Sequence, residues 1–571
     1  MGRELQRAFL WMIFLLALFM LWDAWQVRNG NPSFFGTPEP VKQEQVVENE
    51  IPSGDTQTVA QADSQTVASD VNVTIAQPVV VTTDLFKITF DAKGASVVRA
   101  ELLKERQTPD WTTRGLPGLI LGSSEEEQKD VGNVVLFDTS AQHVYKAETG
   151  LIGGNFPNHR TPFRLVSNNL TLQDGQESLQ VQFAATQGNV ELVKTYVFHR
   201  GHYGIDVKHE VRNKGNVAIS PSVYMQLTRD DSKVATDSSF YNTFTGPAAY
   251  TDSEKFQKID FESIADKDTD LPSQSNEGWI AMLQHYFLTA WVPQQDSSRE
   301  LYTRQLDKHL FSIGSIVTVG EVAPGADKVV DSTLYVGPQD QRRLEYIAPN
   351  LDLVVDYGWL TFLAKPIYWL LAFLQGLVGN WGWAIVLLTV LVKAILYPIS
   401  AAGYKSMARM RDVAPRMKAI QEKYANDKQA LNQAMMELYR REKINPAGGC
   451  LPIMLQIPVF LALYWVLLAT VELRGAPWLL WVNDLASPDP YLILPLLMVA
   501  TMIIQMKISP RPTDPTQAKV MMIMPVVFGV MFFFFASGLV LYWLTNNVLS
   551  IWQQWYVNKQ IEEERRKRTI S

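Results

Sequence analysis

A long apolar segment with one charge inside it constrains the fold of this chain more than any other feature. Residues 383–398 read W-A-I-V-L-L-T-V-L-V-K-A-I-L-Y-P, and Lys393 is the charge. Such a run is typical of a membrane-spanning helix, where a central lysine costs about 2.5–3.5 kcal/mol on insertion. A helix would place Thr389 one turn before Lys393 and Tyr397 one turn after it, on one polar face.

Two interpretations of Lys393 are open at this point. Its long side chain can reach the nearer membrane interface, because Tyr397 and Pro398 follow within about one helical turn. Alternatively, Lys393 faces a water-filled cavity inside the bilayer. The second interpretation requires further polar side chains in the neighbouring spans, so the rest of the chain must decide between them.

Charge is divided unevenly along the chain, whose net charge is −7. Residues 31–350 contain 42 acids and 27 bases, a net charge of −15, whereas residues 351–571 have a net charge of +7. This split indicates that the two parts lie in different compartments. The single cysteine, Cys450, excludes an intrachain disulfide, so an external domain would rely on its hydrophobic core alone.

The first part of the chain predicts an anchor and a tether. Residues 8–25 are almost entirely apolar, follow Arg3 and Arg7, and lack a small-residue cleavage site. We therefore expect residues 1–28 to be a retained transmembrane anchor with its basic end in the cytoplasm. Residues 29–80 are rich in polar and acidic residues and predict a flexible linker.

A large all-β domain is predicted for residues 81–346, because polar and apolar residues alternate there. Examples are K-I-T-F, S-L-Q-V-Q-F and Y-G-I-D-V-K-H-E-V, separated by turn signals such as Asp91-Ala92-Lys93-Gly94. Many alternating strands favour an antiparallel sandwich. The seven histidines all lie in this part, and we interpret them as solvated sheet residues rather than metal ligands: His143, His159, His199, His202, His209, His285 and His309.

The remainder predicts a polytopic helical membrane region of six spans in total, counting the N-terminal anchor. Residues 352–378 favour an interfacial amphipathic helix, and residues 381–399 the second transmembrane helix. A basic stretch at residues 400–445 predicts a cytoplasmic helical hairpin with breaks at Pro415 and residues 425–427. Four further spans (residues 451–557) and a basic cytoplasmic tail (558–571) complete the chain, with both termini cytoplasmic and residues 26–350 outside.

Polar residues recur inside the predicted spans. Lys393, Thr389, Gln456 and Asn547 supply more polarity than helix packing needs, although hydrogen bonding between helices remains the alternative. The spans contain no histidine and no mid-span acid to pair with Lys393. We find no Gly-rich phosphate loop, no metal set and no nucleophile–base pair, so we expect no enzyme activity and no cofactor.

Several motifs resemble the YidC family, bacterial inner-membrane protein insertases related to the Oxa family of mitochondria and plastids. They span about residues 352–559 and comprise N-W-G-W-A-I-V-L-L-T-V-L-V-K-A-I-L-Y-P, Y-R-R-E-K-I-N-P-A-G-G-C-L-P-I-M-L-Q-I-P-V-F-L-A-L-Y, A-P-W-L-L-W-V-N-D-L and S-G-L-V-L-Y-W. The N-terminal anchor followed by a large β domain resembles the Gram-negative arrangement of the family. The resemblance implies a periplasmic super-β-sandwich of the kind seen in carbohydrate-binding folds.

The resemblance also implies a mechanism and partners. Family members form a hydrophilic groove within the bilayer, open to the cytoplasm and to lipid, with one positive residue in its wall. That residue is usually Arg and here is Lys393, which keeps the charge but lacks the planar guanidinium. Tyr542 and Trp543 match the family's substrate-contacting pair, and Ala536 stands where Pro is common. Nascent membrane proteins and the Sec translocon are the partners implied.

Basic residues of the hairpin suggest further partners. Arg440, Arg441 and Lys443 belong to ten bases in the stretch and would steer an encounter with the ribosome or signal-recognition targeting factors. Contact with anionic membrane lipids is the alternative. We expect no direct sequence-specific binding of nucleic acid.

Rival functions differ in what they require. A solute transporter would use Lys393 as a substrate counter-ion, but it predicts inverted repeats, and we see no internal symmetry between the spans. A membrane enzyme lacks its catalytic set, and a ligand sensor would leave the polar residues of the spans unexplained.

Overall fold

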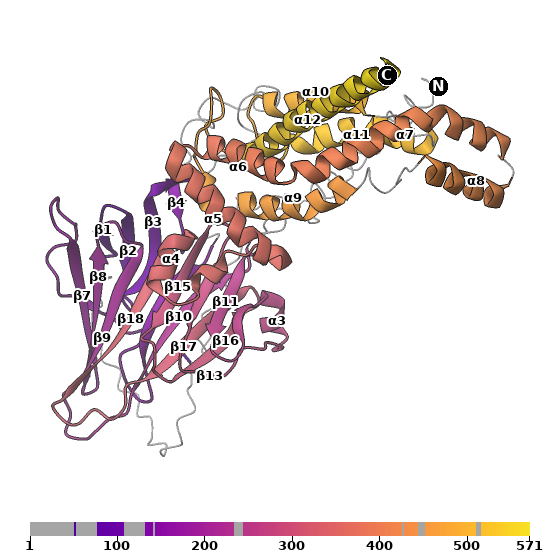
Figure 1. Ribbon diagram of the computed structural model, residues 1–571. Helices are drawn as coiled ribbons and strands as arrows, with labels where there is room; N and C mark the ends of the chain where they lie inside the picture. Colours follow the sequence, from indigo (N-terminus) through magenta and orange to yellow (C-terminus); the bar gives the residue numbers. More distant parts are fainter. Residues whose placement is uncertain are drawn as a thin grey trace, which may run out of the picture. The chain divides into compact units, whose positions relative to one another are not determined.

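The computed structural model describes residues 51–52, 77–107, 132–140, 143–232, 244–424, 427–442, 451–509 and 515–570. The predicted N-terminal anchor and most of the linker therefore lie outside the described residues. The chain divides into two compact units, one centred on Val135–Gly337 and the other on Asp352–Ser571. Figure 1 shows strands in the first unit and helices in the second.

The first unit contains two nine-stranded antiparallel sheets. One sheet has the order β1-β2-β3-β5-β10-β17-β16-β13, with β4 paired to β3: β1 Val79–Thr82, β2 Phe86–Asp91, β3 Ser96–Arg106, β4 Asn133–Val135, β5 Tyr145–Ile152, β10 Ser222–Asp230, β13 Gln274–Ser275, β16 Arg299–Asp307 and β17 Leu310–Thr318. The other has the order β12-β11-β14-β15-β18-β9-β8-β7-β6: β6 Arg164–Leu165, β7 Ser178–Gln187, β8 Val190–His199, β9 Gly204–Asn213, β11 Gly246–Thr251, β12 Lys255–Lys258, β14 Trp279–Leu283, β15 Phe287–Pro293 and β18 Asp327–Pro338.

Contacts between side chains show that the two sheets face each other. Trp291 of β15 donates its indole N–H to the carbonyl of Gln226 in β10 at 3.3 Å. The hydroxyls of Tyr145 in β5 and Thr289 in β15 lie 2.5 Å apart. The predicted β-sandwich is confirmed, and the alternating segments of the sequence form β2, β7, β8, β9 and β10.

A tight turn joins β2 to β3, as the sequence predicts. Gly94 has φ +77°, a left-handed conformation that side chains disfavour. A Cβ atom at this position would lie 2.4 Å from the carbonyl oxygen of His159. Only glycine fits both the backbone angle and the close approach of the neighbouring segment.

Two histidines differ from their predicted solvated state. His209 is fully buried, and its Nε2 lies 2.9 Å from the hydroxyl of Thr149. His159 is 4% exposed, and its Nδ1 lies 2.5 Å from the hydroxyl of Tyr224. His209 lies on the same face of β9 as the buried Val207 and Val211, because alternate residues of a strand share a face, and it therefore points inward.

A buried lysine links the two sheets. Lys194 in β8 is 0% exposed, and its Nζ donates to the carbonyls of Gly94 at 2.6 Å and Thr149 at 2.7 Å. Burial lowers the pKa of the Lys194 ammonium to about 7, and the Glu148 carboxylate opposes this shift. A neutral amine has two N–H groups, and the two carbonyls accept both.

The second unit consists mainly of helices. Its described helices are α4 Gln341–Ile347, η2 Leu351–Val354, η3 Gly358–Leu360, α5 Thr361–Val378, α6 Trp381–Ile395, α7 Tyr397–Lys423, α8 Lys428–Arg441, α9 Leu451–Ala469, η5 Val471–Leu473, α10 Ile493–Ile508, α11 Pro515–Phe532 and α12 Ser537–Ile570. A short helix of the first unit, α3, spans Phe261–Ala265.

The helices differ in how well they meet the requirements for crossing a membrane. Within the described residues, Gly358–Val378 is long and apolar enough by length and composition, and the bent pair Trp381–Ile395 and Tyr397–Met410 adds a second if it forms one span. Shorter apolar helices cover Gln456–Ala469, Ile493–Ile508 and Met522–Phe532. The predicted interfacial segment thus meets the length criterion for a span, and the count of six spans stays a prediction.

The hairpin of α7 and α8 has its own small core. Val413 and Met417 of α7 pack against Leu438 of α8. Asp427 caps α8 by accepting hydrogen bonds from the backbone N–H groups of Gln429 and Ala430, both at 3.0 Å.

Pro415 does not break the first arm of the hairpin, contrary to the sequence-based expectation, because α7 continues through it. Its exposed position lets water bind the carbonyl that a proline leaves without an N–H partner.

The buried Lys194 predicts how the stability of the sandwich depends on pH. Its pKa of about 7 in the folded chain lies below the value of about 10.4 in an unfolded chain. The unfolded chain therefore binds more protons between these values, so stability rises with pH from about 7 to 10. Each pKa unit corresponds to about 1.4 kcal/mol.

We expect Lys194→Met to lower the stability of the sandwich, because two carbonyls lose their donor, and to flatten this rise. The measurement is the urea midpoint of the β-sheet circular dichroism signal of the full chain in detergent, at several pH values. If the urea midpoint rose equally with pH in Lys194→Met and in wild type, Lys194 would not be the cause of the pH dependence.

Candidate functional site

The site is built around a polar face of α12. Tyr542, Asn546 and Ser550 follow one another at intervals of four residues, so they lie on one side of the helix. Tyr542 is 2% exposed and Ser550 9% exposed. α12 packs against α6, α7, α9 and α10, so this face is directed into the helical unit.

Lys393 reaches this face from α6. It is 5% exposed, and its Nζ donates to the hydroxyl of Ser550 at 2.7 Å. Ser550 in turn donates to the backbone carbonyl of Asn546 at 2.7 Å. Among the residues that the structure describes, no carboxylate lies within ion-pair distance of the Lys393 ammonium. The charge is therefore buried against a neutral acceptor.

α9 completes the network from the other side. The amide of Gln456 donates to Oδ1 of Asn546 at 2.5 Å, and its side chain also hydrogen-bonds Tyr542. Lys393, Gln456 and Tyr542, which the sequence singles out, thus meet through Asn546 and Ser550. The network joins three helices that are far apart in the chain.

Trp543 lies in an aromatic cluster beside the network. Its ring centroid is 4.2 Å from that of Phe460, 5.0 Å from that of Phe532 and 6.2 Å from that of Phe528. Tyr542 stacks on Phe460, with the ring centroids 6.1 Å apart. Tyr542 and Trp543 therefore belong to one aromatic surface between α9, α11 and α12.

The other two predicted groove residues are placed differently. The Thr389 hydroxyl donates to the carbonyl of Ile385 in its own helix at 2.7 Å, and the residue is 1% exposed. The Asn547 amide points to α10, with Met498 Sδ at 3.3 Å and the hydroxyl of Thr501 at 3.4 Å. Neither hydrogen-bonds Lys393.

α6 ends before Tyr397, so the polar face that was predicted to run from Thr389 through Lys393 to Tyr397 is interrupted. The chain bends by 63° between Trp381–Ile395 and Tyr397–Met410. Lys393 consequently lies in the last turn of α6, where the helix dipole favours a cation. Pro398 near the start of α7 accounts for the break, because proline cannot continue the hydrogen bonding of the preceding helix.

Three contacts fix the start of α6. The Asn380 side chain caps the helix by accepting from the Trp383 N–H at 3.1 Å, and its amide donates to the Pro477 carbonyl at 2.9 Å. Gly382 lies directly against Trp478, because a Cβ atom there would be 2.3 Å from its ring.

The hairpin places its candidate contact residues on the surface. Arg440 and Arg441 are exposed at the end of α8, and Arg441 pairs with Glu437 at 3.3 Å. Arg416 pairs with Glu442 at 2.5 Å across the two arms. Lys443 lies outside the described residues.

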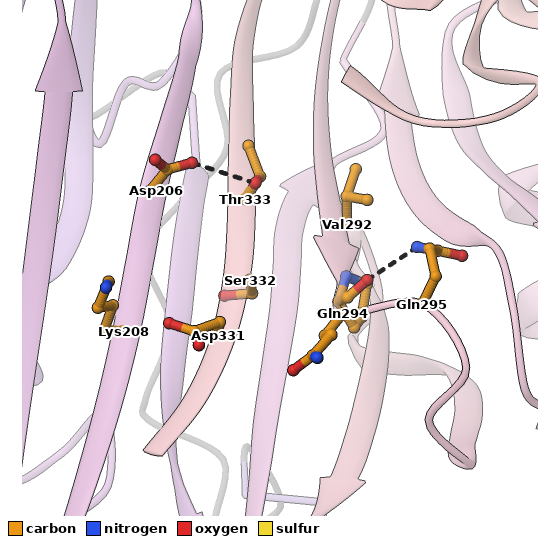
Figure 2. A pocket seen from close by; sticks show the side chains of 9 residues that line it. Asp206, Lys208, Val292, Gln294, Gln295, Asp331, Ser332 and Thr333 are labelled. Atoms are coloured by element: carbon orange, nitrogen blue, oxygen red, sulfur yellow. Dashed lines mark hydrogen bonds between the residues drawn. The ribbon is translucent and has the colours of Figure 1, made fainter. Parts of the chain in front are cut away.

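A second concave region lies on the β-sandwich (Figure 2). It is an open cleft of about 410 Å³ between β9, β18 and the end of β15, and Asp206 accepts from the Thr333 hydroxyl at 3.4 Å. It is lined by Asp206, Lys208, Val292, Pro293, Gln294, Gln295, Asp331, Ser332 and Thr333. Lys208 pairs in register with Asp331, so acids and base alternate on this face.

Comparison with known proteins supplies the family. Residues 78–370 match the model of the YidC periplasmic domain, and residues 373–564 match the model of the 60Kd inner membrane protein. A membrane protein insertase YidC of Bordetella petrii is 52% identical, covering 98% of this chain and 99% of the relative. The corresponding protein of Cupriavidus necator is 48% identical, covering 98% of each.

The chain belongs to the YidC family of membrane protein insertases. A solved structure of an active YidC insertase with its first transmembrane domain resolved aligns with a TM-score of 0.38 and 18% identity, covering 84% of this chain and 93% of that one.

Family membership confirms the predicted function. The chain is a membrane protein insertase, not an enzyme, and it acts on substrate membrane proteins in the bacterial inner membrane. Its β-sandwich is the periplasmic domain of a YidC protein. The transporter interpretation of Lys393 does not hold for a chain of this family.

Sequence reasoning missed Ser550 and Asn546 as the direct partners of Lys393 and Gln456. Both residues stand out as polar positions in a predicted span. Asn546 follows Tyr542 by four residues and Ser550 follows Asn546 by four, and this spacing was the signal that could have placed both on the face of Tyr542.

Gly382 provides a test of how α6 is positioned. We expect Gly382→Val to displace Trp478 and the start of α6, because the added atoms have no space. Overpacking of this kind costs about 1–3 kcal/mol. Lower thermal stability of the purified protein should follow, whereas Gly376→Val in α5, where a Cβ meets nothing within 4 Å, is the control. Equal effects of the two changes would contradict the close packing.

Proposed function

We propose that this insertase works through a hydrophilic groove within the bilayer, bordered by α6, α9 and α12 and open to the cytoplasm and to lipid. Lys393, Thr389, Gln456, Tyr542, Trp543 and Asn547 would line or support this groove. Substrate segments would pass along the polar face of α12 while their flanking residues cross the membrane.

The observation that carries the proposal is the buried Lys393 ammonium, to which the described part of the chain supplies one neutral acceptor, the hydroxyl of Ser550. A buried charge is costly unless it is paired or hydrated. Lysine has three N–H donors, so a groove that admits water or an acidic substrate residue would satisfy those that Ser550 does not. In addition, two buried amide oxygens of the predicted spans have no hydrogen-bond partner: Gln505 Oε1 and Gln553 Oε1.

The groove would lower the barrier to insertion. Polar flanks and unpaired backbone groups are expensive in hydrocarbon, so a polar path that reaches partway shortens the distance they must travel without water. Lys393 would attract acidic residues of the translocated tail. Burial of the apolar segment in lipid, worth about 25 cal/mol per Å², would then drive its release.

Topology and partners complete the proposal. Both termini and the hairpin would lie in the cytoplasm, and the domain of residues 81–346 in the periplasm. Insertion would occur alone or with the Sec translocon. The exposed Arg440 and Arg441 support contact with the ribosome or targeting factors, because basic surfaces attract RNA-rich and acidic partners.

Substitution of Lys393 tests the role of its charge. Lys393→Arg should be tolerated, whereas Lys393→Ala should reduce insertion of substrates that carry Asp or Glu in a short translocated tail. An opposite charge at about 4 Å contributes roughly 4 kcal/mol at a dielectric constant near 20. After desolvation and entropy, we expect a loss on the order of 1–2 kcal/mol in capture.

The assay compares two substrates that differ only in tail charge, with insertase levels checked by immunoblot. Neutral-tailed substrates should insert normally. Equal loss for both substrates, or no loss for either, would show that Lys393 does not attract the tail.

Charge reversal tests the hairpin contact. Arg440→Glu with Arg441→Glu should reduce co-sedimentation with translating ribosomes several-fold, and the loss should shrink at high salt because steering is screened. Lys418→Glu with Lys423→Glu in α7 is the matched control, since Lys418 is also exposed. An equal reduction by both pairs would point to general attraction to acidic surfaces rather than a contact on α8.

A further inference from the structure

Ser550 has a more specific arrangement than an ordinary polar residue of a packed helix. Its hydroxyl hydrogen goes to the carbonyl of Asn546. Its oxygen accepts from Lys393 Nζ at 2.7 Å, and the Tyr404 hydroxyl of α7 lies next to it. A hydroxyl has one donor and two acceptor lone pairs, so the bonds to Asn546 and Lys393 leave one acceptor position, which the Tyr404 hydroxyl can fill.

The three partners come from three different helices. Lys393 is in the last turn of α6, Tyr404 is in α7, and Asn546 is one turn before Ser550 in α12. α7 follows the 63° bend and continues as the first arm of the hairpin. The position of the ammonium is therefore tied through one hydroxyl to both α12 and α7.

Lysine needs such a partner more than arginine does. Its ammonium is a point charge at the end of four methylene groups, without the planar fork that would fix its direction. On α6, Lys393 follows a helix whose other side chains are apolar apart from Thr389, which bonds its own backbone. The hydroxyl of Ser550 is thus what holds the charge on the polar face of α12.

We propose that Ser550 is a positioning residue for insertion, and that its hydroxyl, held by Asn546 and Tyr404, directs the Lys393 ammonium toward acidic substrate residues. This inference rests on the proposed role of Lys393. It adds that selectivity for acidic tails depends on Ser550 and Tyr404, neither of which carries a charge in the membrane.

The test is the ratio of insertion rates of two substrates that differ only in having Asp or Asn in a short translocated tail. Hydrogen bonds to charged groups contribute enough to predict that Ser550→Ala lowers this ratio about fivefold. Ser550→Thr, which keeps the hydroxyl, should retain the wild-type ratio. Tyr404→Phe should lower it about twofold, since it removes one of the two supports of Ser550.

Thr545→Ala is the matched control. Thr545 lies in the same helix and donates to the carbonyl four residues earlier at 2.8 Å, as Ser550 does, but it has no bond to Lys393. It should leave the ratio unchanged. Ser550→Asp should abolish the preference for acidic tails, because it places a carboxylate against the ammonium.

A double variant separates positioning from a general structural role. In Lys393→Ala, a further Ser550→Ala change should not lower the ratio again, because the group that Ser550 holds is absent. Equal loss for both substrates in Ser550→Ala, or a normal ratio in Ser550→Ala when Lys393→Ala lowers it, would overturn the inference alone. A normal ratio in Lys393→Ala would overturn the steering role and this inference with it. Should Ser550→Ala not accumulate, Tyr404→Phe and Ser550→Asp decide the question.

Discussion

The helical unit is organised around the problem of keeping one positive charge inside an apolar environment. Lys393 is 5% exposed, and its ammonium meets the hydroxyl of Ser550 rather than a carboxylate. The helices around it supply polarity where packing alone would favour apolar contacts: Gln456 from α9, Asn546 from α12 and Tyr404 from α7. An acidic partner would neutralise the charge permanently. In the proposed mechanism, a neutral partner leaves the ammonium able to attract a passing acidic residue and then to release it.

Two lysines that are buried within the described part of the chain, Lys194 and Lys393, illustrate opposite solutions. Lys194 lies inside the β-sandwich, where two backbone carbonyls accept from it and burial lowers the pKa of its ammonium to about 7. Its role is structural, since it connects β8 to the turn after β2 and to β5. Lys393 instead lies in the last turn of α6, where its Nζ donates to one hydroxyl, that of Ser550. In the proposed mechanism, the number of fixed acceptors distinguishes Lys194, which supports the fold, from Lys393, which would remain available to a substrate.

Much of the fold could be predicted because its signals are local. The alternation of polar and apolar residues predicted strands β7, β8 and β9, and the apolar segment around Lys393 predicted helix α6. The errors have physical causes. His209 was expected at the surface, but it lies on the same face of β9 as Val207 and Val211 and therefore points inward. Pro415 was expected to break α7, but its exposed position makes the lost hydrogen bond tolerable. The pairing of Lys393 with Ser550 depends on how α12 is rotated against α6, and no local pattern in either helix specifies that rotation.

Site-specific photocrosslinking during synthesis of a small membrane protein tests the central claim, that substrates pass along the polar and aromatic face of α12. A photoreactive residue at Trp543 should crosslink to the nascent spanning segment, and so should one at Asn546. Val548 and Trp552, which are 49% and 56% exposed on the same helix, provide the comparison. The account predicts nascent-chain adducts from Trp543 and Asn546 that are several times stronger than those from Val548 and Trp552. Equal adducts from all four positions, or adducts only from Val548 and Trp552, would contradict it.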